Sequence, residues 1–217
     1  LDAVLDVAVL AGPVSVAAGA VLNFLSGTHE CTAEAVLSGA GTLRTSGGVA
    51  RIACPAAATL TNEVTGGTFE WVAAEDLELP ALLARGGSMV LGRAVTVNGP
   101  TEWQGTAVTG PGPLRLNGPL TAQPGFARFL TGLTVVVAGG GSGGGFALQG
   151  GTVLSNAPGS VFELSDGNGI GNFGGTDGVF LNAGTLRKTA ASDPSVFVPL
   201  ISSGGLEVQT GTLLLRG

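Results

Sequence analysis

Gly184-Thr-Leu-Arg-Lys188 contains the pattern that decides the fold: a glycine, a small residue, and then alternating apolar and polar side chains. Closely related phrases begin at Gly19, Gly41, Gly67, Gly87, Gly105, Gly159 and Gly205. The gaps between neighbouring copies are 22, 26, 20 and 18 residues in the first part of the chain, and 25 and 21 residues in the last part. A period of this size is typical of repeat proteins in which each unit is one coil.

Alternation within each phrase predicts a β-strand with one buried face. Side chains along a strand point to opposite faces in turn, so Leu186 is expected to point inward and Arg187 outward. By the same rule, Phe69 and Trp71 share one face of their strand. Stacked coils of this kind bury a continuous apolar column that no single coil buries alone.

Glycine and asparagine occupy the positions where coils are expected to turn. Gly41, Gly67 and Gly184 precede strands, where a corner needs a positive φ or a close backbone approach. Asn156 and Asn182 lie 26 residues apart at matching offsets. We expect these two side chains to point inward at a corner, bond turn amides and stack on one another.

The fold class predicted from these patterns is all-β, a right-handed parallel β-solenoid of nine to ten coils, forming one domain over residues 1–217. A β-sandwich is the alternative, because it also has short strands at close spacing. The glycine-rich segment 138–146 is interpreted as a loop inside one continuous solenoid, since strand-like sequence resumes at Phe146.

Composition excludes several classes of protein. The chain is 44% hydrophobic and 11% charged, which is incompatible with disorder, and its apolar runs are too short for a membrane-spanning helix. The net charge is −6, and the only basic pair is Arg187-Lys188, so we expect no nucleic-acid partner.

The two cysteines and the histidine lie near the start of the chain. Cys31 and Cys54 are 23 residues apart, about one coil, so a disulfide between stacked coils is expected, with two buried thiols as the alternative. His29, the only histidine, should share a strand face with Cys31. A catalytic pair is not favoured, because no third residue is available to orient the histidine.

Acidic residues suggest two further sites, neither of which is favoured. Asp166, Asn168 and Asp177 are spaced like part of a calcium loop, but residue five is an isoleucine and the closing residue is not a glutamate. The preferred interpretation is a solvent-exposed turn, so no cofactor is expected and calcium remains an alternative. The carboxylates within 75–78 lack a basic companion for sugar cleavage and are expected to form a solvated face.

The stretches 180–189 and 205–215 resemble a β-solenoid repeat of large bacterial surface and secreted proteins. Such repeats read Asn-x-Gly-Thr-Leu-x-Lys, then a variable stretch, then Gly-x-Leu/Val-x-Val and Gly-Thr-Leu. The match is close over roughly residues 150–217 and looser upstream. The resemblance implies an extracellular or cell-surface location and a spacer, stalk, adhesin-like or filament-building role, with no catalytic residues to transfer.

The expected function is therefore a non-enzymatic extracellular structural module, either a spacer or a self-assembling filament subunit. Both ends read as uncapped strands, and unpaired strand edges favour stacking. Since the chain starts at Leu1, a processed or excised segment is the other explanation. The residues expected at the assembly ends are Leu1, Val4, Leu5, Val7, Val9, Leu206, Val208, Leu213 and Leu215. Alternatives are an adhesin-like module that binds a glycan or cell surface and, less favoured, a polysaccharide-acting enzyme.

Overall fold

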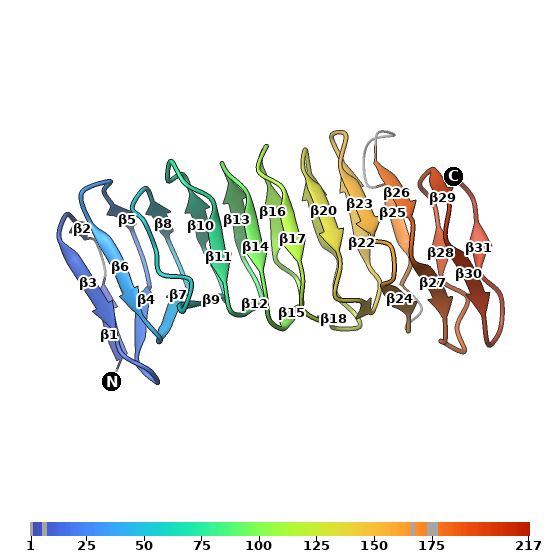
Figure 1. Cartoon of the computed structure of the whole chain (residues 1–217), viewed down its shortest axis with the longest axis horizontal. Helices are drawn as coiled ribbons and strands as arrows, with labels where there is room; N and C mark the ends of the chain where they lie inside the picture. Colours follow the sequence, from blue (N-terminus) through green and yellow to red (C-terminus); the bar gives the residue numbers. More distant parts are fainter. Residues whose placement is uncertain (1, 6–7, 166–167, 173–177) are drawn as a thin grey trace.

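The computed structural model describes residues 2–5, 8–165, 168–172 and 178–217 of the 217-residue chain. The described residues form no helix; their strands stack as a β-solenoid of about ten turns. Figure 1 shows a rod that runs from β1 at one end to β31 at the other. The prediction of a parallel β-solenoid with nine to ten coils is confirmed, and the β-sandwich alternative is wrong.

Two sheets run the whole length of the rod, each with 11 parallel strands. The first sheet, here called face A, contains β1 (Asp2–Leu5), β4 (Val21–Phe24), β7 (Thr42–Thr45), β9 (Thr61–Val64), β12 (Leu82–Ala84), β15 (Thr101–Trp103), β18 (Leu120–Ala122), β21 (Gly141–Ser142), β24 (Val161–Leu164), β27 (Thr185–Lys188) and β30 (Gly205–Val208). The second sheet, face B, contains β2 (Val9–Leu10), β5 (Thr28–Cys31), β8 (Val49–Ile52), β10 (Thr68–Trp71), β13 (Ser88–Leu91), β16 (Ala107–Thr109), β19 (Arg128–Thr131), β22 (Phe146–Gln149), β25 (Ile170–Asn172), β28 (Ser195–Val196) and β31 (Leu214–Leu215).

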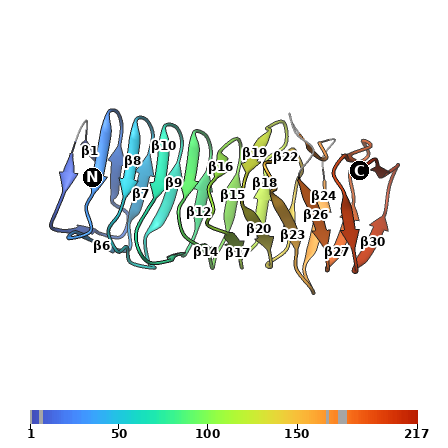
Figure 2. The same ribbon diagram turned by 90° about the horizontal axis from the view of Figure 1, so that it is seen from above.

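A third side of the coil is a regular sheet only from the fourth coil onward. This sheet, face C, contains β11 (Leu77–Leu79), β14 (Val95–Val97), β17 (Leu114–Leu116), β20 (Thr134–Val137), β23 (Val153–Asn156), β26 (Val179–Asn182) and β29 (Leu200–Ser202). Nearer the start, β3 (Pro13–Val16) pairs only with β6 (Val36–Gly39), and a single bridge joins Leu37 to Ala56. Figure 2 shows these coils from above as a regular stack.

The inward positions of successive strands form the core. Leu186 is fully buried while its neighbour Arg187 lies on the outer surface, and Phe69 and Trp71 are both buried, as the alternation predicts. Four aromatic rings stack through the second half of the core, with neighbouring centroids 5.8, 6.0 and 6.1 Å apart. They belong to Trp103, Phe146, Phe162 and Phe180.

Glycines at the coil corners serve two different needs. Gly67 has a φ of 64°, a conformation that side-chain-bearing residues rarely adopt. Gly41 and Gly184 have ordinary φ values, but each packs against the backbone of the preceding coil. A Cβ atom on Gly41 would lie 2.5 Å from the carbonyl oxygen of Ala17, and one on Gly184 would lie 2.5 Å from that of Ala157. Close stacking of coils therefore requires glycine at both places.

The glycine-rich segment 138–146 stays within the solenoid but is not wholly a loop. Gly141 and Ser142 form β21, which pairs with β18 on one side and β24 on the other. The buried Arg128 helps to hold the adjoining turns, because its guanidinium donates hydrogen bonds to the carbonyl oxygens of Trp103 and Gly144. The face A sheet thus continues across the segment without interruption.

Candidate functional site

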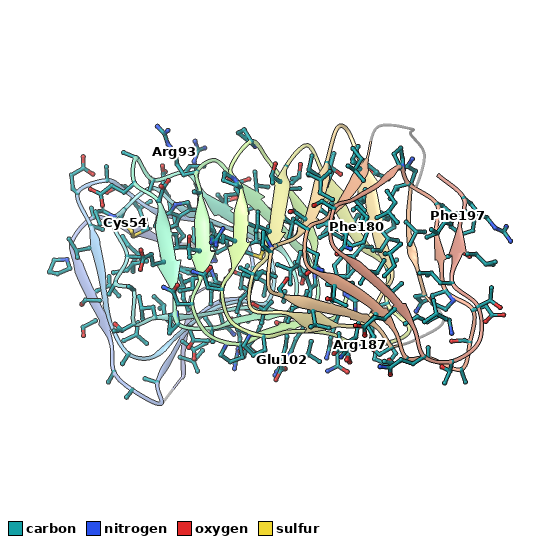
Figure 3. All side chains as sticks on the ribbon, turned by 45° about the vertical axis from the view of Figure 1, so that its right-hand side comes forward. Cys54, Arg93, Glu102, Phe180, Arg187 and Phe197 are labelled. Carbon is teal, nitrogen blue, oxygen red and sulfur yellow. A yellow bond between two sulfur atoms is a disulfide. The ribbon has the colours of Figure 1, made fainter. Side chains whose placement is uncertain are left out.

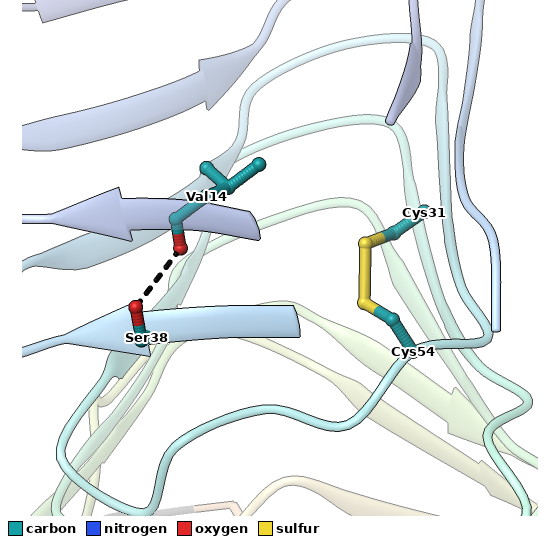
Figure 4. Close-up of a disulfide and its surroundings, with 4 residues drawn as sticks. All are labelled: Val14, Cys31, Ser38 and Cys54. Atoms are coloured by element: carbon teal, nitrogen blue, oxygen red, sulfur yellow. Dashed lines mark hydrogen bonds between the residues drawn. A yellow bond between two sulfur atoms is a disulfide. The ribbon is translucent and has the colours of Figure 1, made fainter. Parts of the chain in front are cut away.

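A disulfide joins two neighbouring coils near the start of the rod. Cys31, in β5, and Cys54, just after β8, are bonded with their Cα atoms 5.7 Å apart, and both are buried. Figure 4 shows this bond together with the hydrogen bond from the Ser38 hydroxyl to the carbonyl oxygen of Val14, 3.2 Å long. The predicted disulfide is confirmed. It joins covalently two coils that are also held together by the pairing of β5 with β8.

His29 lies on the inward face together with Cys31. Its Nε2 atom is 2.6 Å from the carbonyl oxygen of Ser26, which only accepts hydrogen bonds, so Nε2 carries the proton. The ring packs 5.0 Å from that of Phe24, and the side chain is buried. Because the sulfur of Cys31 is in the disulfide, the two residues do not form a nucleophile and base.

The acidic positions named from the sequence do not gather into a site. Glu75, Asp76 and Glu78 are exposed. Asp76 accepts a hydrogen bond from the Ala94 amide, and Glu78 accepts one from the Asn98 side chain, so the expected solvated face is present. Over the described part of the chain, no group of three His, Cys, Asp or Glu residues is placed to hold a metal ion.

Of the calcium-loop residues, only Asn168 is described, in the short stretch before β25. Asp166 and Asp177 lie outside the described residues. The calcium alternative for Asp166, Asn168 and Asp177 therefore stays a prediction.

Asn156 and Asn182 meet at the corner between face C and face A. They are register partners in β23 and β26, both buried, and Asn156 Nδ2 donates a 2.8 Å hydrogen bond to Asn182 Oδ1. Asn182 Nδ2 in turn donates to Ser202 Oγ, at 2.9 Å, in the next coil. These contacts place the asparagines in a structural ladder rather than in a ligand site.

Lys188, the only lysine of the chain, occupies an inward position that the sequence analysis did not single out. It is fully buried, in register with Leu164 of the preceding coil and Val208 of the following one. Its Nζ atom donates hydrogen bonds to the carbonyl oxygens of Ala190, at 2.6 Å, and Thr210. The alternation that predicts an outward Arg187 also predicts an inward Lys188. The burial of Lys188 could therefore have been predicted from the sequence.

Charged side chains form ladders on the outer surface of face A. Glu63 lies between Arg44 and Arg85, with nitrogen–oxygen distances of 2.6 and 3.0 Å, and Arg85 also contacts Glu102 at 3.2 Å. Nearer the C-terminal end, Arg187 lies between Glu163, at 3.2 Å, and Glu207, at 2.7 Å. Figure 3 shows Glu102 and Arg187 along the same edge of the rod.

The last coil leaves inward positions uncovered. Leu206, Val208 and Leu215 are in register with Leu186, Lys188 and Val196, which are 0% exposed, yet they are themselves 46%, 51% and 51% exposed. We call Leu206, Val208 and Leu215 the C-terminal face. Leu213, also named from the sequence, is partly buried against the core.

At the N-terminal end of the rod, the residues named from the sequence do not all take the same kind of position. Val9 is in edge strand β2, and its register partner is Glu30, so its exposed side chain points to the outer side of the rod. The role of Val9 as an end contact stays a prediction. Val4 and Leu5 are in edge strand β1, in register with Asn23 and Phe24. Leu1 and Val7 lie outside the described residues.

Comparisons of the chain with known protein families, with curated proteins and with solved structures find no match. Among the described residues there is no helix of the length and apolar character needed to cross a membrane.

Proposed function

We propose that this protein is a non-enzymatic structural module of the cell exterior, a stiff β-solenoid rod that lengthens by axial stacking. The observation that carries this proposal is the C-terminal face: Leu206 and Val208 continue two inward columns whose preceding members, Leu186 and Lys188, are fully buried. Removing apolar surface of this kind from water favours association.

The strand edges at the two ends support a head-to-tail arrangement. Within the described residues, β29, β30 and β31 each have one strand partner, as do β1, β2 and β3 at the other end. All pairings along the rod are parallel, so a second copy added in the same orientation would continue each face with the same pairing. Head-to-tail contacts that do not close into a ring build filaments.

The extracellular setting is supported by the disulfide. Bonds such as Cys31–Cys54 persist in oxidising compartments and are rare in the cytosol of most organisms. The non-enzymatic assignment is supported by the pairing of the reactive groups, since Cys31 is oxidised and His29 bonds a main-chain carbonyl.

The test is negative-stain electron microscopy with sedimentation velocity over a range of protein concentrations. We expect rods to associate end to end, and the double variant Leu206→Lys/Val208→Lys to weaken this association about tenfold or more, because each lysine charge would lose water on stacking. Val90→Lys is the matched control, since Val90 lies on the outward side of β13 in mid-rod.

Single rods at every concentration would contradict self-stacking and leave a spacer. Association that the double variant and Val90→Lys change equally would contradict the assignment of the C-terminal face.

A further inference from the structure

A groove of about 530 Å³ crosses face A at β18, β21 and β24. Its volume is within the range of about 300–1,000 Å³ that is typical of small-molecule sites. The groove begins at the corner with face C, where Pro119 and Gly139 line it, and reaches Glu163 and Arg187 on the outer surface of the sheet.

The glycine-rich segment creates the groove. β21 has only two residues, Gly141 and Ser142, and glycines with positive φ stand on either side of it, Gly140 at 77° and Gly143 at 121°. Gly141 takes the inward position in register with Leu120, so Ser142 is the single side chain that β21 presents outward. Because the Ser142 side chain is short, the outer surface of face A is depressed at β21.

The outward side chains along the groove form one register column. Thr121, Ser142, Glu163 and Arg187 follow one another on β18, β21, β24 and β27. Hydrogen bonds to the carboxylates of Glu207 and Glu163 raise the pKa of Arg187 above its ordinary value, so its guanidinium stays charged. The column thus offers two hydroxyls, a carboxylate and a guanidinium in line.

Much of the hydrogen-bonding capacity of this column is unused. Within the described part of the chain, the hydroxyls of Thr121 and Ser142 make no hydrogen bond, and Glu163 is bonded through Oε1 alone. Arg187 uses Nε and Nη1 and leaves Nη2 without a partner there. Glu63 differs from Glu163, because both of its carboxylate oxygens accept hydrogen bonds, from Arg44 and Arg85, and its side chain is only 6% exposed.

We propose that this groove binds a neutral oligosaccharide. Sugar hydroxyls both donate and accept hydrogen bonds, which matches free donors at Ser142 and Arg187 beside a free acceptor at Glu163 Oε2. The carbon-bound faces of a sugar ring would lie against the flat glycine backbone and against Pro119 and Val161, which also line the groove. This would add glycan binding to the rod, independently of how its ends associate.

Other ligand classes fit less well. A peptide strand cannot add to β21, because β18 and β24 already pair with both of its edges. A calcium ion takes six to eight oxygen ligands, and Glu163 is the only carboxylate that lines the groove. An acidic polysaccharide fits less well, because Arg187, the one cation that lines the groove, is already paired with the carboxylates of Glu163 and Glu207.

The test is isothermal titration calorimetry with cellotetraose, maltotetraose and chitotetraose, with a heparin tetrasaccharide as the acidic probe. We expect at least one neutral tetrasaccharide to bind and the heparin probe not to bind. Ser142→Trp fills the groove and should weaken binding about tenfold or more. Glu163→Gln keeps the side-chain shape and should also weaken binding, because an amide accepts a weaker hydrogen bond than a carboxylate.

Thr96→Trp is the matched control, since Thr96 is a half-buried outward residue of β14 on face C, away from the groove. It should bind as the unmodified protein does, and circular dichroism should show that all variants fold. No binding by any neutral probe, tighter binding of heparin, or equal affinity of Ser142→Trp would each overturn the proposal. The same sugars fixed to beads distinguish recognition of surface glycans from binding of free oligosaccharides. None of these results bears on axial stacking, which is measured separately.

Discussion

Asn156 Nδ2 donates a 2.8 Å hydrogen bond to Asn182 Oδ1 although the two residues are 26 positions apart in the sequence. Each amide also bonds main chain in a following strand: Asn156 Nδ2 reaches the carbonyl oxygen of Thr185, and Asn182 Nδ2 that of Gly205. Buried polar groups are tolerated when their hydrogen bonds are satisfied. The ladder therefore fixes how three coils align at this corner.

We expect Asn182→Ala to lower the free energy of unfolding by about 1–3 kcal/mol, because it removes the hydrogen bond that the buried Asn156 amide donates to Asn182 Oδ1. Asn98→Ala is the control: Asn98 also bonds two neighbours, Glu78 and Asn117, but it is exposed. Water replaces its partners, so the loss should be below about 1 kcal/mol. Urea denaturation measures both values, and equal losses would show that burial of the ladder is unimportant.

Glu63→Gln should destabilise the rod more than Glu102→Gln does. The Glu63 side chain is nearly buried between Arg44 and Arg85, whereas Glu102 is an exposed partner of Arg85 alone. Allowing for the partial exposure of both arginines, we expect a loss of about 1–3 kcal/mol for Glu63→Gln and below about 1 kcal/mol for Glu102→Gln. Urea denaturation at low and high salt checks this, and the opposite order would contradict the assignment.

Cys31→Ala/Cys54→Ala should lower stability by about 3 kcal/mol, the value expected when a cross-link closing a loop of this size is removed. Hydrogen exchange should increase first in β5 and β8, the coils that the bond joins. Reduction of the unmodified protein with a phosphine should reproduce the effect. Faster exchange at the far end alone would be inconsistent with a local cross-link.

Gly184→Ala should destabilise the rod. The new Cβ would lie 2.5 Å from the carbonyl oxygen of Ala157 and closer still to that of Ser160, so the coils would have to separate. Gly12→Ala is the control, because no atom lies within 4 Å of its Cβ position and its φ is not positive. We expect a loss of about 1–3 kcal/mol for the first and little change for the second, measured by thermal unfolding. Equal melting temperatures would contradict the close packing of this corner.

The sequence predicts the coil because the strand phrase and its spacing are local signals. Alternation in Gly184–Lys188 is enough to place Leu186 inside, and a 23-residue separation is enough to stack Cys31 on Cys54. The groove was not predictable in this way. It depends on Gly141 aligning with Leu120 and on Ser142 aligning with Glu163, and variable coil lengths hide that register until the strands are paired. The direction of the Val9 side chain was hidden for the same reason, since its register partner Glu30 decides it.

The buried amine of Lys188 gives the protein an unusual chemical character. It is the only lysine side chain in the sequence, and it is held by two carbonyl oxygens directly beneath the last coil. Amine-reactive dyes and cross-linkers therefore find no lysine on the folded surface. Labelling of Lys188 requires β30 to separate from β27. The rate of Lys188 acylation, measured by mass spectrometry, therefore reports how often these two strands separate, and no engineered probe is needed.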